Sequence, residues 1–211
     1  MNFPTIYPIL DASFLPSGDG HATVLHALVR ELSEAGIGIL QYRNKQGSKH
    51  EILADARVMR AAVENNEIQL ILNDWPYLAV EAGFDGVHVG QGDISPAEAR
   101  AIVGTERIVG VSTHNEAQVQ ASEREPVDYI AIGPVFATTT KQNPDPVVGL
   151  EGVRLARSLT RKPLVGIGGI TLATAADVKT AGADAIALIS AIFSTAGNPA
   201  KFAGDFLRVF G

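Results

Sequence analysis

The sequence predicts an α/β protein, a closed (β/α)8 barrel formed by residues 1–211 as a single domain. Eight short runs rich in Val, Ile, Leu and Ala alternate with segments whose apolar residues recur at helical spacing. Seven of these runs stop at a polar or glycine-rich cluster. In a parallel barrel the carboxyl ends of all strands meet at one face, and that face carries the chemistry. An open, doubly wound sheet is the structural alternative.

The expected strands are short, and several are apolar on both faces, as in a parallel sheet that helices cover. They occupy residues 5–10, 38–42, 69–73, 86–89, 108–111, 129–132, 164–167 and 185–188. Helical patterns lie between them, at residues 23–35, 51–64, 96–103, 116–122, 151–158 and 173–181. The connection 133–149 is long and contains three prolines, so we expect it to fold over the site as a lid, and 11–20 is a second candidate.

Composition limits the partners that the protein can have. A net charge of −6 argues against nucleic acid or an anionic membrane as a partner, although a cleft can still attract a small anionic substrate. The absence of cysteine excludes disulfides and thiolate zinc sites. We expect a cytoplasmic protein, because the first residues do not resemble a signal peptide and no apolar run reaches about 18 residues. A homo-oligomer is compatible with the sequence.

The first cluster, residues 41–45, combines polar and cationic side chains. Gln41, Arg43 and Lys45 alternate along an extended segment, so their side chains share one face. If that face points into the barrel mouth, a guanidinium fork and an ammonium group would meet a diphosphate there. The alternative is a solvated loop that follows a strand.

Two carboxylates follow neighbouring strands. Asn73 ends the strand 69–73, Asp74 follows it directly, and Asp93 follows the next strand, 86–89. Mg²⁺ prefers a small number of carboxylates, completed by substrate phosphate and water, so this pair predicts a magnesium site. Helix N-capping is the alternative for both residues, because each precedes a helical pattern, and one residue can serve both purposes.

The remaining clusters are rich in hydroxyl groups and glycine. Ser112 could donate to a phosphate or cap a helix, and His88 and His114 are more typical of structural histidines. No nucleophile elbow or Ser-His-Asp relay is indicated. Gly168-Gly169 and Ile189-Ser190 follow the seventh and eighth strands, where barrels commonly bind phosphate on backbone N–H groups. Thr138, Thr140 and Lys141 add hydroxyl and ammonium groups on the longest connection.

Together these segments resemble the thiamine-phosphate synthase family over essentially the whole chain. The matching stretches are Gln-Tyr-Arg-Asn-Lys at 41–45, Leu-Asn-Asp at 72–74, Asp-Gly-Val-His-Val-Gly-Gln-Gly-Asp at 85–93, Gly-Val-Ser-Thr-His at 110–114, Tyr-Ile-Ala-Ile-Gly-Pro-Val-Phe-Ala-Thr-Thr-Thr-Lys at 129–141, Val-Gly-Ile-Gly-Gly-Ile at 165–170 and Ile-Ser-Ala-Ile at 189–192. The resemblance implies a TIM barrel and a transferase that joins a hydroxymethylpyrimidine diphosphate to a thiazole phosphate, with both small molecules as its partners.

The resemblance also implies roles for individual residues. Arg43, Lys45 and Lys141 would stabilise the leaving diphosphate and so act in catalysis, and Asp74 and Asp93 would hold Mg²⁺, the expected cofactor. The pyrimidine diphosphate would contact Gln41, Arg43, Lys45, Asn73, Ser112 and Lys141. The thiazole phosphate would contact Thr138, Thr140, Gly169, Ile189 and Ser190. Tyr42, Asn44 and Thr139 are further expected substrate-binding residues within the same clusters.

Two other functions stay open at this point. A sister group on the same fold resembles a thiazole tautomerase, in which a histidine matching His114 transfers a proton and the diphosphate-binding residues are degraded. Here those residues are present, which favours the synthase. A non-catalytic ligand-sensing barrel is the second alternative, because a fold alone does not determine function, but it would leave the carboxylate pair unexplained.

Overall fold

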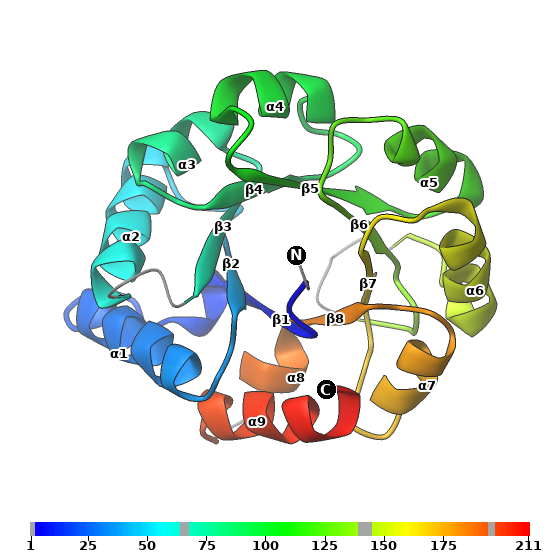
Figure 1. The fold of residues 1–211 in the computed structure, drawn as a ribbon. Helices are drawn as coiled ribbons and strands as arrows, with labels where there is room; N and C mark the ends of the chain where they lie inside the picture. The colour runs from blue at the N-terminus through cyan, green and yellow to red at the C-terminus, as the bar shows by residue number, and fades with distance from the viewer. Residues whose placement is uncertain (1–2, 64–67, 139–144, 194–196) are drawn as a thin grey trace.

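The computed structural model describes residues 3–63, 68–138, 145–193 and 197–211. Each strand pairs in parallel with the next, and β8 pairs with β1, which closes the barrel seen in Figure 1. The strands are β1 Ile6–Asp11, β2 Ile39–Arg43, β3 Gln69–Asn73, β4 Gly86–Val89, β5 Ile108–Thr113, β6 Tyr129–Ile132, β7 Leu164–Ile167 and β8 Ala185–Leu188. The predicted (β/α)8 barrel is therefore confirmed, and the open sheet is excluded.

Helices surround the strands as an outer ring (Figure 1). They are α1 His21–Glu34, α2 Lys49–Ala62, α3 Pro76–Glu81, α4 Pro96–Val103, α5 Glu116–Glu123, α6 Gly149–Leu159, α7 Ala175–Thr180, α8 Ser190–Phe193 and α9 Pro199–Phe210. A short 3-10 helix, Ala12–Phe14, follows β1. The predicted helical segments all coincide with helices. The structure adds α3 and α8, which span six and four residues and are therefore too short for a periodic pattern. It also adds α9, a helix of 12 residues that the predicted segments did not include.

The core has two layers. Between strands and helices lies a large aliphatic layer, and inside the barrel lies a smaller one that includes Tyr7, Ile39, Ile71 and Tyr129. Tyr129 reaches across the interior only because its neighbour on β5 is Gly110, where a Cβ atom would collide with the tyrosine ring. The aromatic rings thus fill the barrel below its mouth, and a ligand can enter only above them.

The face of the barrel opposite the mouth carries a repeated ion pair. In each case an aspartate stands directly before β4, β6 or β8. Its carboxylate accepts a hydrogen bond from a backbone N–H of the preceding strand and also pairs with an arginine of a surrounding helix. The three pairs are Asp85 with Arg60, Asp128 with Arg100, and Asp184 with Arg157. The carboxyl ends of the strands, at the opposite face, are where the cavity opens.

No helix in the described part of the chain combines the length and the apolar character needed to cross a membrane.

Candidate active site

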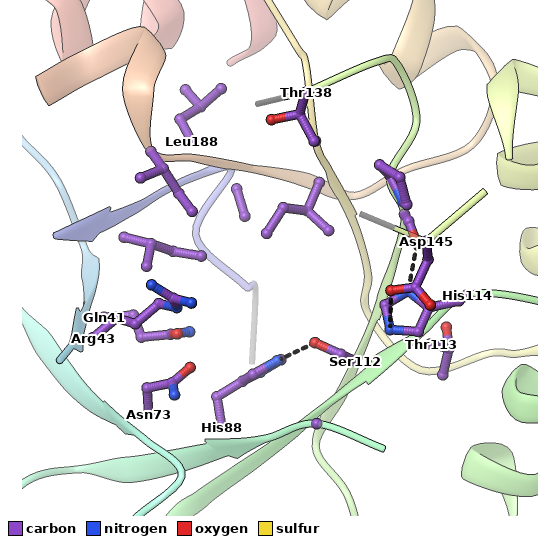
Figure 2. A pocket seen from close by; sticks show the side chains of 18 of the residues that line it. Gln41, Arg43, Asn73, His88, Ser112, Thr113, His114, Thr138, Asp145 and Leu188 are labelled. Atoms are coloured by element: carbon purple, nitrogen blue, oxygen red, sulfur yellow. Dashed lines mark hydrogen bonds and ion pairs between the residues drawn. The ribbon is translucent and has the colours of Figure 1, made fainter. Parts of the chain in front are cut away.

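A cavity of about 500 Å³ opens at the carboxyl ends of the strands. Most predicted site residues line it, although they are spread over the whole sequence. Those residues are Gln41, Arg43, Lys45, Asn73, Asp74, Asp93, Ser112, Thr138, Gly169, Ile189 and Ser190. Figure 2 shows Gln41, Arg43 and Asn73 along one side of this space, with Thr138 above it. Thr139, Thr140 and Lys141 lie outside the described residues.

Arg43 is held at the mouth by a buried carboxylate that sequence reasoning missed. Asp11 and Arg43 are direct partners in the pairing of β1 with β2, and their side chains form an ion pair. Ser13 also donates to Asp11, through its N–H at 3.0 Å and its hydroxyl at 2.6 Å. Burial opposes ionisation, but the hydrogen bonds from Ser13 and the charge of Arg43 outweigh it and lower the pKa of Asp11. Asp11 therefore stays ionised and fixes the guanidinium.

Asp74 and Asp93 lie side by side, and the ammonium group of Lys45 forms an ion pair with Asp74. Burial, together with the neighbouring Asp93, raises the pKa of Asp74 to about 6, even though Lys45 forms an ion pair with it. The pKa of Asp93 is lowered despite burial, because Asp74 and the Gly90 N–H donate to its carboxylate. Two adjacent carboxylates that cannot both ionise without cost are a ready site for a cation.

The donor set fits Mg²⁺ without forming a complete protein cage. Within the described ranges no group of three or more acidic or histidine side chains gathers around a common point. Mg²⁺ is commonly bound by one or two carboxylates, with waters and substrate phosphates completing its shell. Asp74 also has a φ of 69°, a left-handed conformation that is uncommon for residues other than glycine and often marks a functional position.

Helix capping does not explain the polar clusters. The N-cap of α3 is Trp75, and that of α4 is Ser95, which forms a capping box with Glu98. Asp93 accepts from the Gly90 N–H at 2.8 Å and so closes the turn after β4 instead. Ser112 belongs to β5, and Asn115 caps the following helix. The capping interpretations of Asp74, Asp93 and Ser112 are therefore wrong.

A buried chain of hydrogen bonds forms the floor of the cavity, and sequence reasoning missed most of it. Gln41 Nε2 donates to the Tyr7 hydroxyl at 2.9 Å, which lies 2.8 Å from the Tyr129 hydroxyl. The chain continues to His88 Nδ1 at 2.7 Å and from His88 Nε2 to Ser112 Oγ at 2.8 Å (Figure 2). The available signal was that Tyr7, Tyr129 and His88 are polar-tipped residues inside otherwise apolar strands.

The structure does not bring Tyr42 into the cavity. Because side chains alternate along β2, Gln41 and Arg43 face inward while Tyr42 packs between the strands and the helices. Its hydroxyl donates to the buried carboxylate of Asp55, and burial raises its pKa far above the usual range. Asn44 also lies outside the main cavity. Its amide bonds Tyr42 and the backbone of Gly47, so both residues shape the segment that carries Arg43 and Lys45.

An adjoining cavity of about 1210 Å³ lies beyond this segment, along the connection 11–20. Its wall includes His21, whose Nδ1 lies 2.9 Å from the Pro16 carbonyl and whose Nε2 lies 2.8 Å from Asp55. Both ring nitrogens thus face acceptors. The Pro16 carbonyl raises the pKa of His21 above its usual 6.5, burial opposes this, and Asp55 adds to the rise.

The contribution of His21 to stability should depend on pH. Because its folded pKa is raised, the stabilisation is fully present below the unfolded value of 6.5 and is lost as pH rises through the folded value. We expect the melting temperature of the wild-type protein to exceed that of His21→Gln at pH 6, and the difference to shrink by pH 9. His26→Gln, which changes another histidine of α1, is the control variant. A difference that stayed constant between pH 6 and pH 9 would contradict this assignment.

His114 lies at the base of the long connection 133–149. Its Nδ1 is 2.6 Å from the Gly133 carbonyl, and its Nε2 is 3.4 Å from Asp145 (Figure 2). The histidine therefore joins the two described ends of the connection. Residues 139–144 lie outside the described residues, so the lid stays a prediction. The connection 11–20 lies against the adjoining cavity.

The fold and the site together define a (β/α)8 barrel whose mouth combines two cations, a carboxylate pair and a glycine-rich turn. A family model described as thiamine monophosphate synthase matches residues 6–192. A thiamine-phosphate synthase of Koribacter versatilis is 48% identical over 209 residues, covering 99% of this chain and 97% of that protein. One of Chloroflexus aurantiacus is 39% identical over 187 residues, covering 89% and 84%.

A solved structure agrees with these relatives. The thiamine phosphate pyrophosphorylase of Pyrococcus furiosus superposes with a TM-score of 0.85 at 27% identity, covering 99% of this chain and 96% of that one. The chain belongs to the thiamine monophosphate synthase family, whose members are transferases. The resemblance noted in the sequence, and the expectation of an enzyme of this class, are thus confirmed.

Proposed function

We propose that this protein joins a hydroxymethylpyrimidine diphosphate to a thiazole phosphate, forming thiamine phosphate and releasing diphosphate. The observation that carries this proposal is the composition of the barrel mouth. The ends of β2 to β4 offer Arg43, Lys45 and the Asp74–Asp93 pair, and the ends of β7 and β8 offer the Gly168–Gly169 turn and the start of α8 at Ser190. In a chain 48% identical to a thiamine-phosphate synthase, these two groups would bind a diphosphate and a phosphate separately.

The diphosphate would bind over β2 to β5. The guanidinium of Arg43 is already held in place by Asp11, so it can meet phosphate oxygens without reorganising. The Lys45 ammonium is about two-fifths exposed and can turn from Asp74 towards the substrate. Asp74 and Asp93 would hold Mg²⁺, which when bound would neutralise part of the diphosphate charge.

The bond that breaks is the one between the pyrimidine methylene carbon and the diphosphate oxygen, and the electron pair leaves with the diphosphate. Arg43 and Lys45 stabilise the charge that develops on that oxygen. The electron-rich aminopyrimidine spreads the positive charge left on the methylene carbon. The lone pair of the thiazole nitrogen then forms the new C–N bond. The protein holds the two substrates in position and supplies positive charge to the leaving diphosphate. Lys141 would be the third cation, beside Arg43 and Lys45.

Histidine and serine at this site do not form a hydrolytic relay. Ser112 and His88 are in hydrogen-bond contact, but the other ring nitrogen of His88 faces the Tyr129 hydroxyl and not a carboxylate. A Ser-His-Asp relay needs a carboxylate there to accept the ring N–H. The arrangement thus supports a reaction in which the second substrate, and not a side chain, is the nucleophile.

The decisive test is incubation of the purified protein with both substrates and Mg²⁺, with thiamine phosphate and diphosphate measured as products. Formation of both in equal amounts supports the synthase. Interconversion of the thiazole alone, without use of the pyrimidine diphosphate, would favour the tautomerase. Binding without turnover would favour the sensing barrel.

Ser190→Asp should separate the two subsites. The added carboxylate would lie where α8 begins and repel the thiazole phosphate, so we expect KM for that substrate to rise at least about tenfold, roughly 1.4 kcal/mol. KM for the pyrimidine diphosphate should change little. Ser48→Asp is the matched control, because it adds the same charge at an N-cap outside both cavities. An equal rise in both KM values would mean that the subsites are wrongly divided.

Gly169 is less suitable for this purpose. Its φ is +64°, and a Cβ atom there would lie 2.8 Å from Phe136 Cβ and closer still to the Ala137 carbonyl. Any larger residue would therefore strain the backbone and displace the connection above it. A loss of thiazole phosphate binding in such a variant would not distinguish a blocked subsite from a shifted loop.

A further inference from the structure

The donors and acceptors along the cavity floor take their direction from Gln41 at one end. Gln41 donates to the Tyr7 oxygen through Nε2, so the Tyr7 hydroxyl hydrogen must point elsewhere, and its next neighbour is Tyr129. Burial raises the pKa of both tyrosines well above the usual range, so each keeps its proton. Tyr129 accepts from Tyr7 and donates to the next group, His88 Nδ1.

The direction of the chain decides which nitrogen of His88 carries a proton. Because Nδ1 accepts from Tyr129, the ring proton is on Nε2, and this N–H donates to Ser112 Oγ at 2.8 Å. Ser112 then accepts through its oxygen, and its own hydrogen is directed away from His88. Ser112 lines the cavity, so that hydrogen is available to an acceptor there.

We propose that Tyr129 and His88 are positioning residues that hold the Ser112 hydroxyl as a hydrogen-bond donor to an anionic oxygen in the cavity, an assignment that rests on the proposed function for the identity of that anion. With the proton on Nδ1 instead, His88 would accept from Ser112, and the serine would present lone pairs to the diphosphate. The buried tyrosines thus determine, through His88, whether Ser112 donates or accepts a hydrogen bond at the mouth.

The proton position can be measured without substrate. Long-range ¹H–¹⁵N NMR correlations of the ¹⁵N-histidine-labelled protein identify which ring nitrogen of each histidine is protonated, and a His88→Asn spectrum assigns the His88 signals. We expect wild-type His88 to carry its proton on Nε2. We expect Tyr129→Phe, which removes the donor to Nδ1, to populate the other tautomer. Tyr7→Phe, the matched control in the same layer, keeps the Tyr129 donor and should leave His88 unchanged.

Steady-state kinetics test whether the hydrogen bond donated by the Ser112 hydroxyl contributes to turnover. Ser112→Ala should lower kcat about tenfold or more, as expected for a lost hydrogen bond to a charged group. A glutamine amide reaches the position of Nε2, whereas an asparagine amide reaches that of Nδ1. His88→Gln should therefore retain most of the activity, and His88→Asn should lose as much as Ser112→Ala. The double variant His88→Asn/Ser112→Ala should lose no more than either one. Tyr77→Phe is the control for the Tyr129→Phe and Tyr7→Phe variants, because it removes the same hydroxyl group from an exposed tyrosine of α3.

Three results would overturn the proposal. One is a wild-type His88 protonated on Nδ1 alone. Another is equal tautomer populations in the Tyr129→Phe and Tyr7→Phe variants. The third is multiplicative losses in the double variant, with melting temperatures close to that of the wild type. If the wild-type protein made no thiamine phosphate, the proposed function would fail, while the NMR measurement would still decide the proton arrangement.

Discussion

Asparagine in place of Asp74 should lower Mg²⁺-dependent kcat by about 100-fold or more, because a bound metal ion contributes several kcal/mol of charge stabilisation. The substitution removes one charge from the carboxylate pair and keeps the shape of the side chain. Asparagine also tolerates the left-handed backbone that Asp74 adopts at φ 69°, whereas alanine would add strain of its own. A change in activity can then be attributed to the lost charge and not to misfolding.

The measurement combines turnover with metal binding. Calorimetric titration of Mg²⁺ in the presence of diphosphate should give a measurable affinity for the wild type and none for Asp74→Asn, while both melt at similar temperatures. Asp145→Asn changes a carboxylate that also lines the cavity but pairs with His114, so it should have a much smaller effect. Near-full activity in Asp93→Asn would show that this residue only closes the turn with Gly90.

The positions of the strands and of the mouth residues could be predicted from the sequence for a physical reason. A parallel strand buried on both faces must be apolar until it reaches the mouth, so the first polar residue after each apolar run marks the functional face. This pattern located Asn73, Asp74 and Asp93. It also indicated Gln41 and Arg43 correctly, because the side chains of an extended segment alternate.

Contacts between distant segments were beyond this pattern. Tyr42 was placed with its neighbours because it lies within the same cluster, but alternation turns it towards Asp55 in α2. Asp11 was not singled out because its role depends on pairing opposite Arg43 in the adjacent strand. The chain from Tyr7 to His88 likewise depends on three strands meeting inside the barrel, where Gly110 leaves room for Tyr129.

The second large effect concerns Arg43, whose replacement by alanine should lower kcat about 100-fold. The guanidinium is the most firmly held cation among the described residues of the mouth, and loss of a preorganised donor to developing charge costs about 10²- to 10³-fold. KM for the thiazole phosphate should change little, because the proposed subsite for that phosphate is built from the segments after β7 and β8 and not from β2. Arg43→Lys keeps the charge but not the planar fork, so it should recover only part of the activity.

A double variant tests whether the ion pair with Asp11 positions the Arg43 guanidinium. In Arg43→Ala the Asp11 carboxylate stays at the mouth, held by Ser13 alone, and repels the diphosphate. The double variant Arg43→Ala/Asp11→Asn removes that repulsion and should be more active than Arg43→Ala, although Asp11→Asn by itself should be less active than the wild type. Steady-state kinetics of the four proteins measures this coupling. Independent, multiplicative effects would mean that the ion pair does not position the guanidinium.

His114→Ala is the comparison that separates synthase from tautomerase. In the synthase the histidine joins Gly133 to Asp145, so its loss should loosen the connection 133–149 and reduce kcat less than Arg43→Ala does. In a tautomerase the same histidine would transfer the proton, and its loss would abolish turnover while Arg43→Ala had no effect. The order of the two kcat values, measured with both substrates at saturation, therefore identifies which reaction the barrel mouth performs.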